Sequence, residues 1–130
     1  MFQEDNYYTR DYIHAQLGGG LQDYLPHKDG RIVCACLRPD TNPDAPDILL
    51  VGSTPVIYRW ACVFCNQKLP IPTFVKARAK QWRYVGTYFA EAWTENQVEI
   101  AIHSQRAQRT DIRRVVYLMK FADPRFQIRR

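Results

Sequence analysis

Near the middle of the chain, residues 71–89 read Ile71-Pro-Thr-Phe-Val-Lys-Ala-Arg-Ala-Lys-Gln-Trp-Arg-Tyr-Val-Gly-Thr-Tyr-Phe89, and this stretch carries the strongest signal for the fold. Thr73–Ala77 predicts a strand in which Lys76 is the most polar residue. A basic turn at 78–81 leads into a second strand, Trp82–Phe89. Because side chains alternate along a strand, one face is expected to hold Trp82, Tyr84, Gly86 and Tyr88, and the other Arg83, Val85, Thr87 and Phe89.

Three helices are expected around these strands. The first spans 9–17, where Thr9 is a suitable N-cap and three glycines follow the last turn. The second spans 55–68, with Ser53 as N-cap, a proline in the first turn and apolar residues at helical spacing. The third spans about 95–108, after the capping-box pattern Thr94-Glu-Asn-Gln97; a strand over 98–102 is the alternative.

The other strands are predicted at 31–38, 48–51 and 111–121, and a loop rich in proline at 39–46. Roughly five short strands interspersed with helices indicate an α+β fold, with a small curved mixed β-sheet or a partly closed barrel. A doubly wound parallel sheet is less well supported, because no glycine-rich phosphate loop follows a strand.

The length of 130 residues is that of one domain, with a core at about 9–122 and a basic tail at 123–130. The apolar share of 46% argues against a disordered chain. Apolar runs are too short for a membrane helix, and the first residues lack the basic start and apolar core of a secretory signal. We therefore expect a cytoplasmic protein that does not contact membranes.

Charge is distributed unevenly along the chain. The net charge is +5, but residues 1–65 carry −3 and residues 66–130 carry +8. A basic surface concentrated in one half is typical of a protein that binds a polyanion. Two basic groups stand out: one around the Trp82 strand, and one formed by Arg106, Arg109, Arg113 and Arg114. Cations next to aromatic rings suit nucleic acid, where cations meet phosphates and rings stack on bases.

The four cysteines form the pairs Cys34-x-Cys36 and Cys62-x-x-Cys65. Two such pairs could form a four-thiolate zinc site. Their apolar surroundings favour buried core cysteines instead, since zinc knuckles usually have glycine and polar residues between the thiols. We predict no metal, with the zinc site as the alternative.

No catalytic motif stands out, so we expect no enzymatic activity from the chain by itself and no cofactor. The three histidines lie far apart in the sequence. Asp40, Asp44 and Asp47 are close together in the proline-rich loop and could hold a divalent cation. The enzymatic alternative is therefore a metal-dependent nuclease or base-processing enzyme that uses these carboxylates.

Several blocks of the sequence together resemble an uncharacterised domain of bacterial and fungal proteins. They include Leu17-Gly-Gly-Gly-x-Gln-x-Tyr-Leu-Pro26, Asn42-Pro-x-Ala-Pro46 and Trp82-x-Tyr-Val-Gly-x-Tyr88. The last block also resembles strands of PUA-like barrels, a group that includes the SRA, EVE, YTH and ASCH modules. This resemblance implies a reader of modified or unusual bases, of the kind that serves as a sensor domain in restriction and defence systems.

A base reader needs stacking rings, amides that read the base edge, close backbone approach and cations for phosphates. The candidate rings are Trp82, Tyr84 and Tyr88, with Tyr24 as a lid. The candidate amides are Gln22 and Asn42, and the candidate backbone segment is Gly18, Gly19 and Gly20. The candidate cations are Lys76, Arg78, Arg83, Arg109 and Arg113.

The expected partner is nucleic acid, with DNA favoured over RNA, and a nuclease or other effector could be fused or bound to the chain. The alternative from another class is a protein-interaction module of a phage or defence system, since a basic surface suits both. Salt dependence of binding separates the two hypotheses, because only a phosphate-driven complex weakens steeply with salt.

Overall fold

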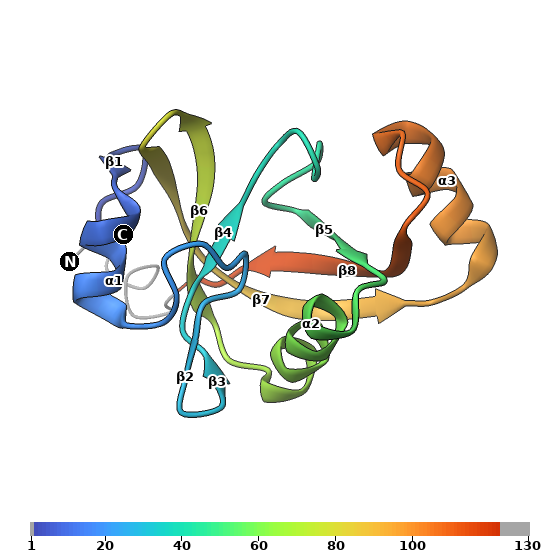
Figure 1. Cartoon of the computed structure of the whole chain (residues 1–130), viewed down its shortest axis with the longest axis horizontal. Helices are drawn as coiled ribbons and strands as arrows, with labels where there is room; N and C mark the ends of the chain where they lie inside the picture. The colour runs from blue at the N-terminus through green and yellow to red at the C-terminus, as the bar shows by residue number, and fades with distance from the viewer. Residues whose placement is uncertain (1, 123–130) are drawn as a thin grey trace.

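A mixed β-sheet is the frame of the fold in the computed structural model, which describes residues 2–122 (Figure 1). The strand order is β4 (Ala35–Leu37), β6 (Ile71–Arg78), β7 (Gln81–Thr94), β8 (Ile112–Lys120) and β5 (Ile48–Gly52). The β4–β6 pair is parallel and the other pairs on this path are antiparallel. The short strand β1 (Tyr7–Tyr8) also pairs with β7. The edge strands β4 and β5 do not pair with each other within residues 2–122, so the sheet is not closed into a barrel. The prediction of an α+β fold built on a mixed sheet is confirmed.

Three helices flank the sheet, as predicted (Figure 1). Helix α1 (Arg10–Leu17) lies at one end of the molecule, with the Thr9 hydroxyl accepting a hydrogen bond from the Tyr12 N–H. Helix α2 (Pro55–Gln67) packs along β5, β7 and β8. Helix α3 (Gln97–Ala107) lies at the other end, against β8.

The boundaries of α2 and α3 differ from the prediction at their N-termini. Thr54, not Ser53, precedes the first turn of α2. For α3 the predicted capping box at Thr94 is wrong, because β7 continues to that residue. Asn96 caps the helix instead, and its side-chain oxygen accepts hydrogen bonds from the N–H groups of Val98 and Glu99.

The predicted strand at 31–38 is divided in two. Its first part is β3 (Arg31–Ile32), which pairs with β2 (His27–Lys28) in a hairpin; its second part is β4. The turn residues Asp29 and Gly30 both have positive φ, as a two-residue hairpin loop of type I′ requires. The Gln67 amide then binds both the N–H and the C=O of Ile32, so these groups are not available to the main sheet.

A bulge in β7 overturns the predicted faces of this strand. Thr73 pairs with Gly86 while the next residue, Phe74, pairs with Tyr84, so one residue of β7 is extra. A bulge reverses which residues point to a given side of a sheet. Trp82 and Tyr84 accordingly belong to the core cluster beside α1, whereas Tyr88 belongs to the main core beneath α2.

Gly86 makes this bend possible. Its φ of 114° is accessible to few residues other than glycine. A Cβ atom at this position would also lie 2.7 Å from the Cε atom of Lys120 on the neighbouring strand.

Three of the four cysteines are buried in the core, as expected: Cys34, Cys36 and Cys65. The first two lie in the cluster with Ile13, and Cys65 lies in the main core. The two cysteine pairs therefore do not meet in one site. No three His, Cys, Asp or Glu side chains gather around a potential metal position in the described part of the chain.

None of the helices within residues 2–122 has both the length and the apolar character needed to cross a bilayer. The basic tail predicted at 123–130 lies outside the described residues.

Candidate functional site

A pocket with a volume of about 550 Å³ lies beside the start of α1. Its walls come from the start of α1, strand β4, the loop after β4 and the β6–β7 hairpin. A further wall comes from residues 18–26 between α1 and β2, which we call the connector. Its lining includes five of the residues that the sequence singled out: Gln22, Tyr24, Asn42, Lys76 and Trp82. It also includes Thr9, Arg10, Asp11, Leu21, Cys36, Arg38, Thr41 and Lys80. We call this hollow the first pocket.

Trp82 forms an aromatic wall of the first pocket with cations above it. The side chain is only 6% exposed. The guanidinium of Arg10 lies 5.2 Å from the ring centroid, and the Lys76 ammonium lies 5.7 Å from it. Arg10 also donates hydrogen bonds to the backbone carbonyls of Gly20 and Asp23, which ties the connector to α1.

The rim of the first pocket is positively charged. Among the lining residues, four are cationic and one, Asp11, is acidic. Arg38 pairs with Asp40 outside the pocket, which lowers the pKa of that carboxyl. Lys76 and Lys80 form no ion pair with any residue in 2–122, so their charge is available to a ligand.

Gln22 has the properties expected of a residue that reads a ligand. Its side chain is exposed, lines the first pocket and forms no hydrogen bond within the described residues. A primary amide offers both a donor and an acceptor. Asp11, in the first turn of α1, is also available to a ligand. Its carboxylate oxygens can accept hydrogen bonds and have no partner in residues 2–122.

Tyr24 is a fixed wall and not the lid that the sequence suggested. Its hydroxyl donates a 2.5 Å hydrogen bond to the backbone carbonyl of Ile57 in α2. Its ring packs against the main core, and burial raises the pKa of the phenol. The backbone carbonyl of Tyr24 also accepts a hydrogen bond from the Cys36 N–H, so both ends of the residue are held.

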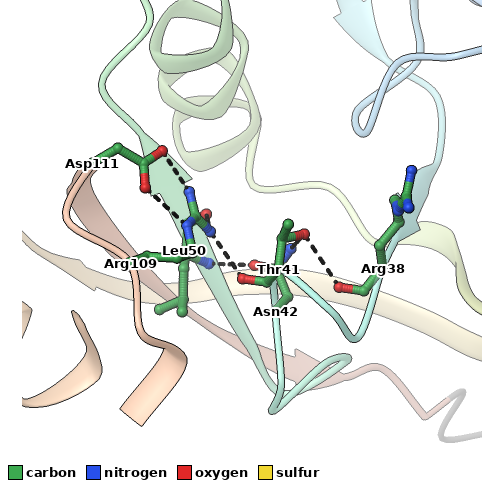
Figure 2. A network of polar contacts seen from close by, with 6 residues as sticks. All are labelled: Arg38, Thr41, Asn42, Leu50, Arg109 and Asp111. Carbon is green, nitrogen blue, oxygen red and sulfur yellow. Dashed lines mark hydrogen bonds and ion pairs between the residues drawn. The ribbon is translucent and has the colours of Figure 1, made fainter. Parts of the chain in front are cut away.

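Asn42 holds the wall between β4 and β5 (Figure 2). Its Oδ1 atom accepts a 2.8 Å hydrogen bond from the buried N–H of Leu50. Its own N–H donates to the carbonyl of Arg38, which closes the turn. With its oxygen engaged and only 6% of its surface exposed, Asn42 is suited to hold the loop and poorly suited to read a base.

Arg109 clamps the same loop from the other side (Figure 2). Its Nη1 atom donates to the carbonyls of Thr41 and Leu50, at 2.9 and 3.2 Å. Its Nε and Nη2 atoms bind both carboxylate oxygens of Asp111, each at 2.9 Å, and this contact lowers the pKa of Asp111. The left-handed conformation of Gln108 ends α3 and turns Arg109 back toward the sheet.

A second pocket of about 490 Å³ adjoins the first. Four residues line both pockets: Gln22, Tyr24, Thr41 and Asn42. The second pocket alone is lined by Asp23, Leu50, Gly52, Ile57, Arg109 and Asp111.

The remaining residues predicted for the site do not line either pocket. Arg83 pairs with Asp5, and Tyr84 packs in the cluster beside α1. Tyr88 is a core residue, 7% exposed. Arg113 is exposed and stacks on the ring of Tyr58, with its guanidinium carbon 3.5 Å from the ring centroid. Arg78 is exposed on the hairpin, in a shallow hollow next to the first pocket.

The three glycines after α1 end the helix and set the backbone conformation at the start of the connector. The N–H of Gly18 binds the His14 carbonyl and ends the helix. Gly19 has a φ of 82°. A Cβ at Gly20 would overlap a carboxylate oxygen of Asp23, so a side chain there would require the Asp23 carboxylate to move.

Three of the four arginines in the group near α3 form ion pairs within the described residues, and Arg113 does not. Arg106 binds both carboxylate oxygens of Asp44, and Arg114 binds Glu95 at 2.8 Å. These contacts lower the pKa of Asp44; that of Glu95 is lowered first by a hydrogen bond from Tyr58 and then by Arg114.

The acidic residues of the proline-rich loop do not converge. Asp40 and Asp44 are each bound to an arginine, and Asp47 is exposed and does not take part in these pairs. The arrangement offers no group of carboxylates that would support the nuclease alternative.

Arg10, Asp11 and Arg38 were missed by the sequence reading. They come from the acidic half of the chain, where no basic cluster marks them. The Thr9 cap predicted that a helix begins at this point. No local sequence pattern indicated that the start of this helix would face the β6–β7 hairpin.

A protein-family model described as a domain of unknown function (DUF6697) matches residues 7–121. A comparison with curated proteins finds no match. Among solved structures, one similar chain is described as the SUVH5 SRA domain in complex with hemimethylated CG DNA. The TM-score is 0.55 at 12% sequence identity, with 95% of this chain and 86% of that chain covered. SRA is one of the PUA-like modules that the Trp82 block resembled, so the expected fold resemblance is confirmed for that module.

Proposed function

This chain belongs to the DUF6697 family of domains of unknown function, and we propose that it is a DNA-binding module that reads a modified or unusual base in the first pocket. The observation that carries the proposal is the first pocket itself. It combines an aromatic wall, an unengaged amide and a cationic rim on a fold similar to an SRA domain bound to hemimethylated DNA. A base turned out of the helix needs this combination.

The polar groups of the first pocket favour a base with an exocyclic amino group. The Asp11 carboxylate is an acceptor, and carboxylates commonly accept from the amino group of cytosine. Gln22 offers a donor and an acceptor to the remaining edge of the base. A base that presents only carbonyls would face the negative charge of Asp11 and bind less well.

The β6–β7 hairpin is the proposed phosphate contact. Lys76 and Lys80 line the first pocket, and Arg78 is exposed on the same hairpin. Within residues 2–122 none of the three forms an ion pair with a carboxylate. A DNA backbone that runs along the hairpin would meet these three charges without breaking an ion pair within residues 2–122, and would release counterions.

We also propose that the module acts as a sensor in a restriction or defence system and directs a nuclease or other effector, fused or bound, to modified DNA. The described chain shows no gathered metal-binding cluster of its own, which is compatible with cleavage by a partner.

Binding to short duplexes with one central modified cytosine tests the proposal by fluorescence anisotropy. Gln22→Ala should weaken binding to the preferred duplex by about 5- to 150-fold, because a good edge contact is worth about 1–3 kcal/mol of discrimination. Gln105→Ala, at an exposed residue of α3, is the matched control and should bind like wild type.

The phosphate contact has its own readout. Lys80→Ala should weaken binding to all duplexes by a similar factor and reduce the slope of log affinity against log salt by about 1. No binding to any duplex at low salt would refute the proposed function. It would favour a protein partner instead, and the apolar side chains Val98 and Ile102, 69% and 62% exposed on α3, are one surface that such a partner could contact.

A further inference from the structure

The two adjoining pockets also indicate which kind of substituent the base carries. We infer that they form one continuous site for a base that carries a neutral, hydroxylated substituent of the size of a hexose. The base occupies the first pocket and the substituent occupies the second. This inference rests on the proposed function and adds the class of modification.

The first argument is size. One water occupies about 30 Å³ in the liquid, so 550 Å³ corresponds to roughly eighteen non-hydrogen atoms. That is about twice the number in a pyrimidine base, and enzymes that extrude a base normally surround it closely. By the same measure the second pocket adds space for roughly sixteen atoms. A methyl group would leave most of this space empty.

The second argument is continuity. Gln22 and Tyr24 come from the connector, and Thr41 and Asn42 come from the loop after β4; all four line both pockets. The two pockets therefore meet at these two segments. In the proposed binding mode, a substituent that projects from a base in the first pocket extends past the exposed residues Gln22 and Thr41 at this boundary.

The third argument is charge. The first pocket has four cationic residues and one acidic residue in its lining, as a phosphodiester requires. The second pocket has two carboxylates, Asp23 and Asp111, and one cation, Arg109, which already binds Asp111. A phosphate or carboxylate substituent would meet net negative charge there. A neutral group with several hydroxyls could instead donate hydrogen bonds to both carboxylates.

The fourth argument is that the second pocket is preformed. The Arg109 clamp fixes the Thr41 and Leu50 carbonyls (Figure 2). Tyr24 is fixed to α2 through a hydrogen bond to the Ile57 carbonyl. The Tyr24 ring and the Ile57 side chain supply the apolar surface on which the C–H face of a sugar packs. Walls that are already ordered reduce the entropic cost of binding.

The test compares four duplexes that differ at a single cytosine: unmodified, 5-methyl, 5-hydroxymethyl and glucosylated 5-hydroxymethyl. We expect the glucosylated duplex to bind at least about tenfold more tightly than the 5-hydroxymethyl duplex, which corresponds to about 1.4 kcal/mol. Ile57→Trp fills the second pocket and should abolish this preference, so that the glucosylated and the 5-hydroxymethyl duplex bind with equal affinity.

Val56→Trp is the matched control, because Val56 is the neighbouring exposed residue of α2 and lines neither pocket. Asp23→Asn should reduce the preference severalfold without filling the pocket. The thermal unfolding midpoint of each variant establishes that it folds.

The outcomes separate the two proposals. If the methylated or hydroxymethylated duplex is preferred and glucosylation weakens binding, the inference about the second pocket is overturned and the proposed function stands. If no duplex is bound in preference to another, the proposed base reading itself fails. An equal loss of preference in Val56→Trp and Ile57→Trp would also overturn the assignment of the second pocket.

Discussion

Arg109 gives the sharpest test of how the site is built, because the sequence suggests a phosphate contact and the structure suggests a clamp. Arg109→Ala removes two hydrogen bonds to backbone carbonyls and a two-point contact with Asp111. The Arg109 side chain is 17% exposed, whereas that of Asp111 is 53% exposed. We therefore expect the loss of stability in Arg109→Ala to come mainly from the two backbone carbonyls that lose their hydrogen-bond donor.

The expected loss of stability can be worked out from these contacts. The partly buried carbonyl of Leu50 loses a charged donor, and an unsatisfied buried acceptor costs about 1–3 kcal/mol. The Thr41 carbonyl is exposed, so water replaces its donor. An ion pair as exposed as this one is worth about 0–1 kcal/mol. We expect Arg109→Ala to lower the free energy of unfolding by about 2–3 kcal/mol, out of the 5–15 kcal/mol typical of a domain.

Urea denaturation measures this loss directly, and the thermal midpoint should fall by roughly 8–12 °C. Arg109→Lys should lose part of it, since one ammonium cannot reach Asp111 and both carbonyls. Arg106→Ala is the matched control: its pair with Asp44 is exposed at the arginine, 61%, and should cost no more than about 1 kcal/mol.

DNA binding then separates the clamp from a phosphate contact. If Arg109 is a clamp, Arg109→Ala weakens binding without changing the dependence of affinity on salt. A variant with wild-type stability and a salt slope reduced by about 1 would refute the clamp and restore the phosphate role.

Two further predictions concern stability. A hydrogen bond from Tyr58, together with Arg114, lowers the pKa of Glu95 in the folded state, so this contribution to stability is complete above the unfolded pKa of about 4.3 and is lost as pH falls through the folded value. Glu95→Gln should therefore destabilise the protein at pH 7 and approach wild type near pH 3 in urea titrations; an equal difference at both values would contradict this. Gly86→Ala should lower the melting temperature measured by circular dichroism more than Gly30→Ala, because the φ of Gly86, 114°, lies further from the left-handed region than the φ of Gly30, 79°, and a Cβ at Gly86 would also displace the Lys120 side chain. Equal melting temperatures would contradict this reasoning.

Much of the fold could be predicted because its signals are local. Thr9, the glycines after Leu17 and Pro55 set helix ends through capping and backbone geometry that involve only neighbouring residues. The turn at Asp29 and Gly30 is similarly local. The bulge in β7 could not be predicted, because it depends on the register with β6, and its consequence was a wrong face for Tyr88.

The candidate site was predicted in part, for a related reason. Gln22, Lys76 and Trp82 belong to segments with visible turn, charge or aromatic signals, and all three line the first pocket. The sequence did not show whether a given polar side chain is available to a ligand. Asn42 and Gln22 have the same amide chemistry, but the oxygen of Asn42 is used by the Leu50 N–H, eight residues further along the chain.

The sequence by itself determined the class of fold, the basic character of the second half and most element positions, since composition and short-range patterns encode them. Only the tertiary structure decided which charges are available. Arg83, Arg106 and Arg114 are matched by carboxylates from other segments of the chain. Arg109 is matched by Asp111, two residues further along, but also donates to the carbonyls of Thr41 and Leu50 from distant segments. The rim of the first pocket joins Arg10 and Arg38 from the acidic half to Lys76 and Lys80 from the basic half. Charge along a chain is a sum over residues, whereas charge in a site depends on which residues the fold brings within a few ångströms of one another.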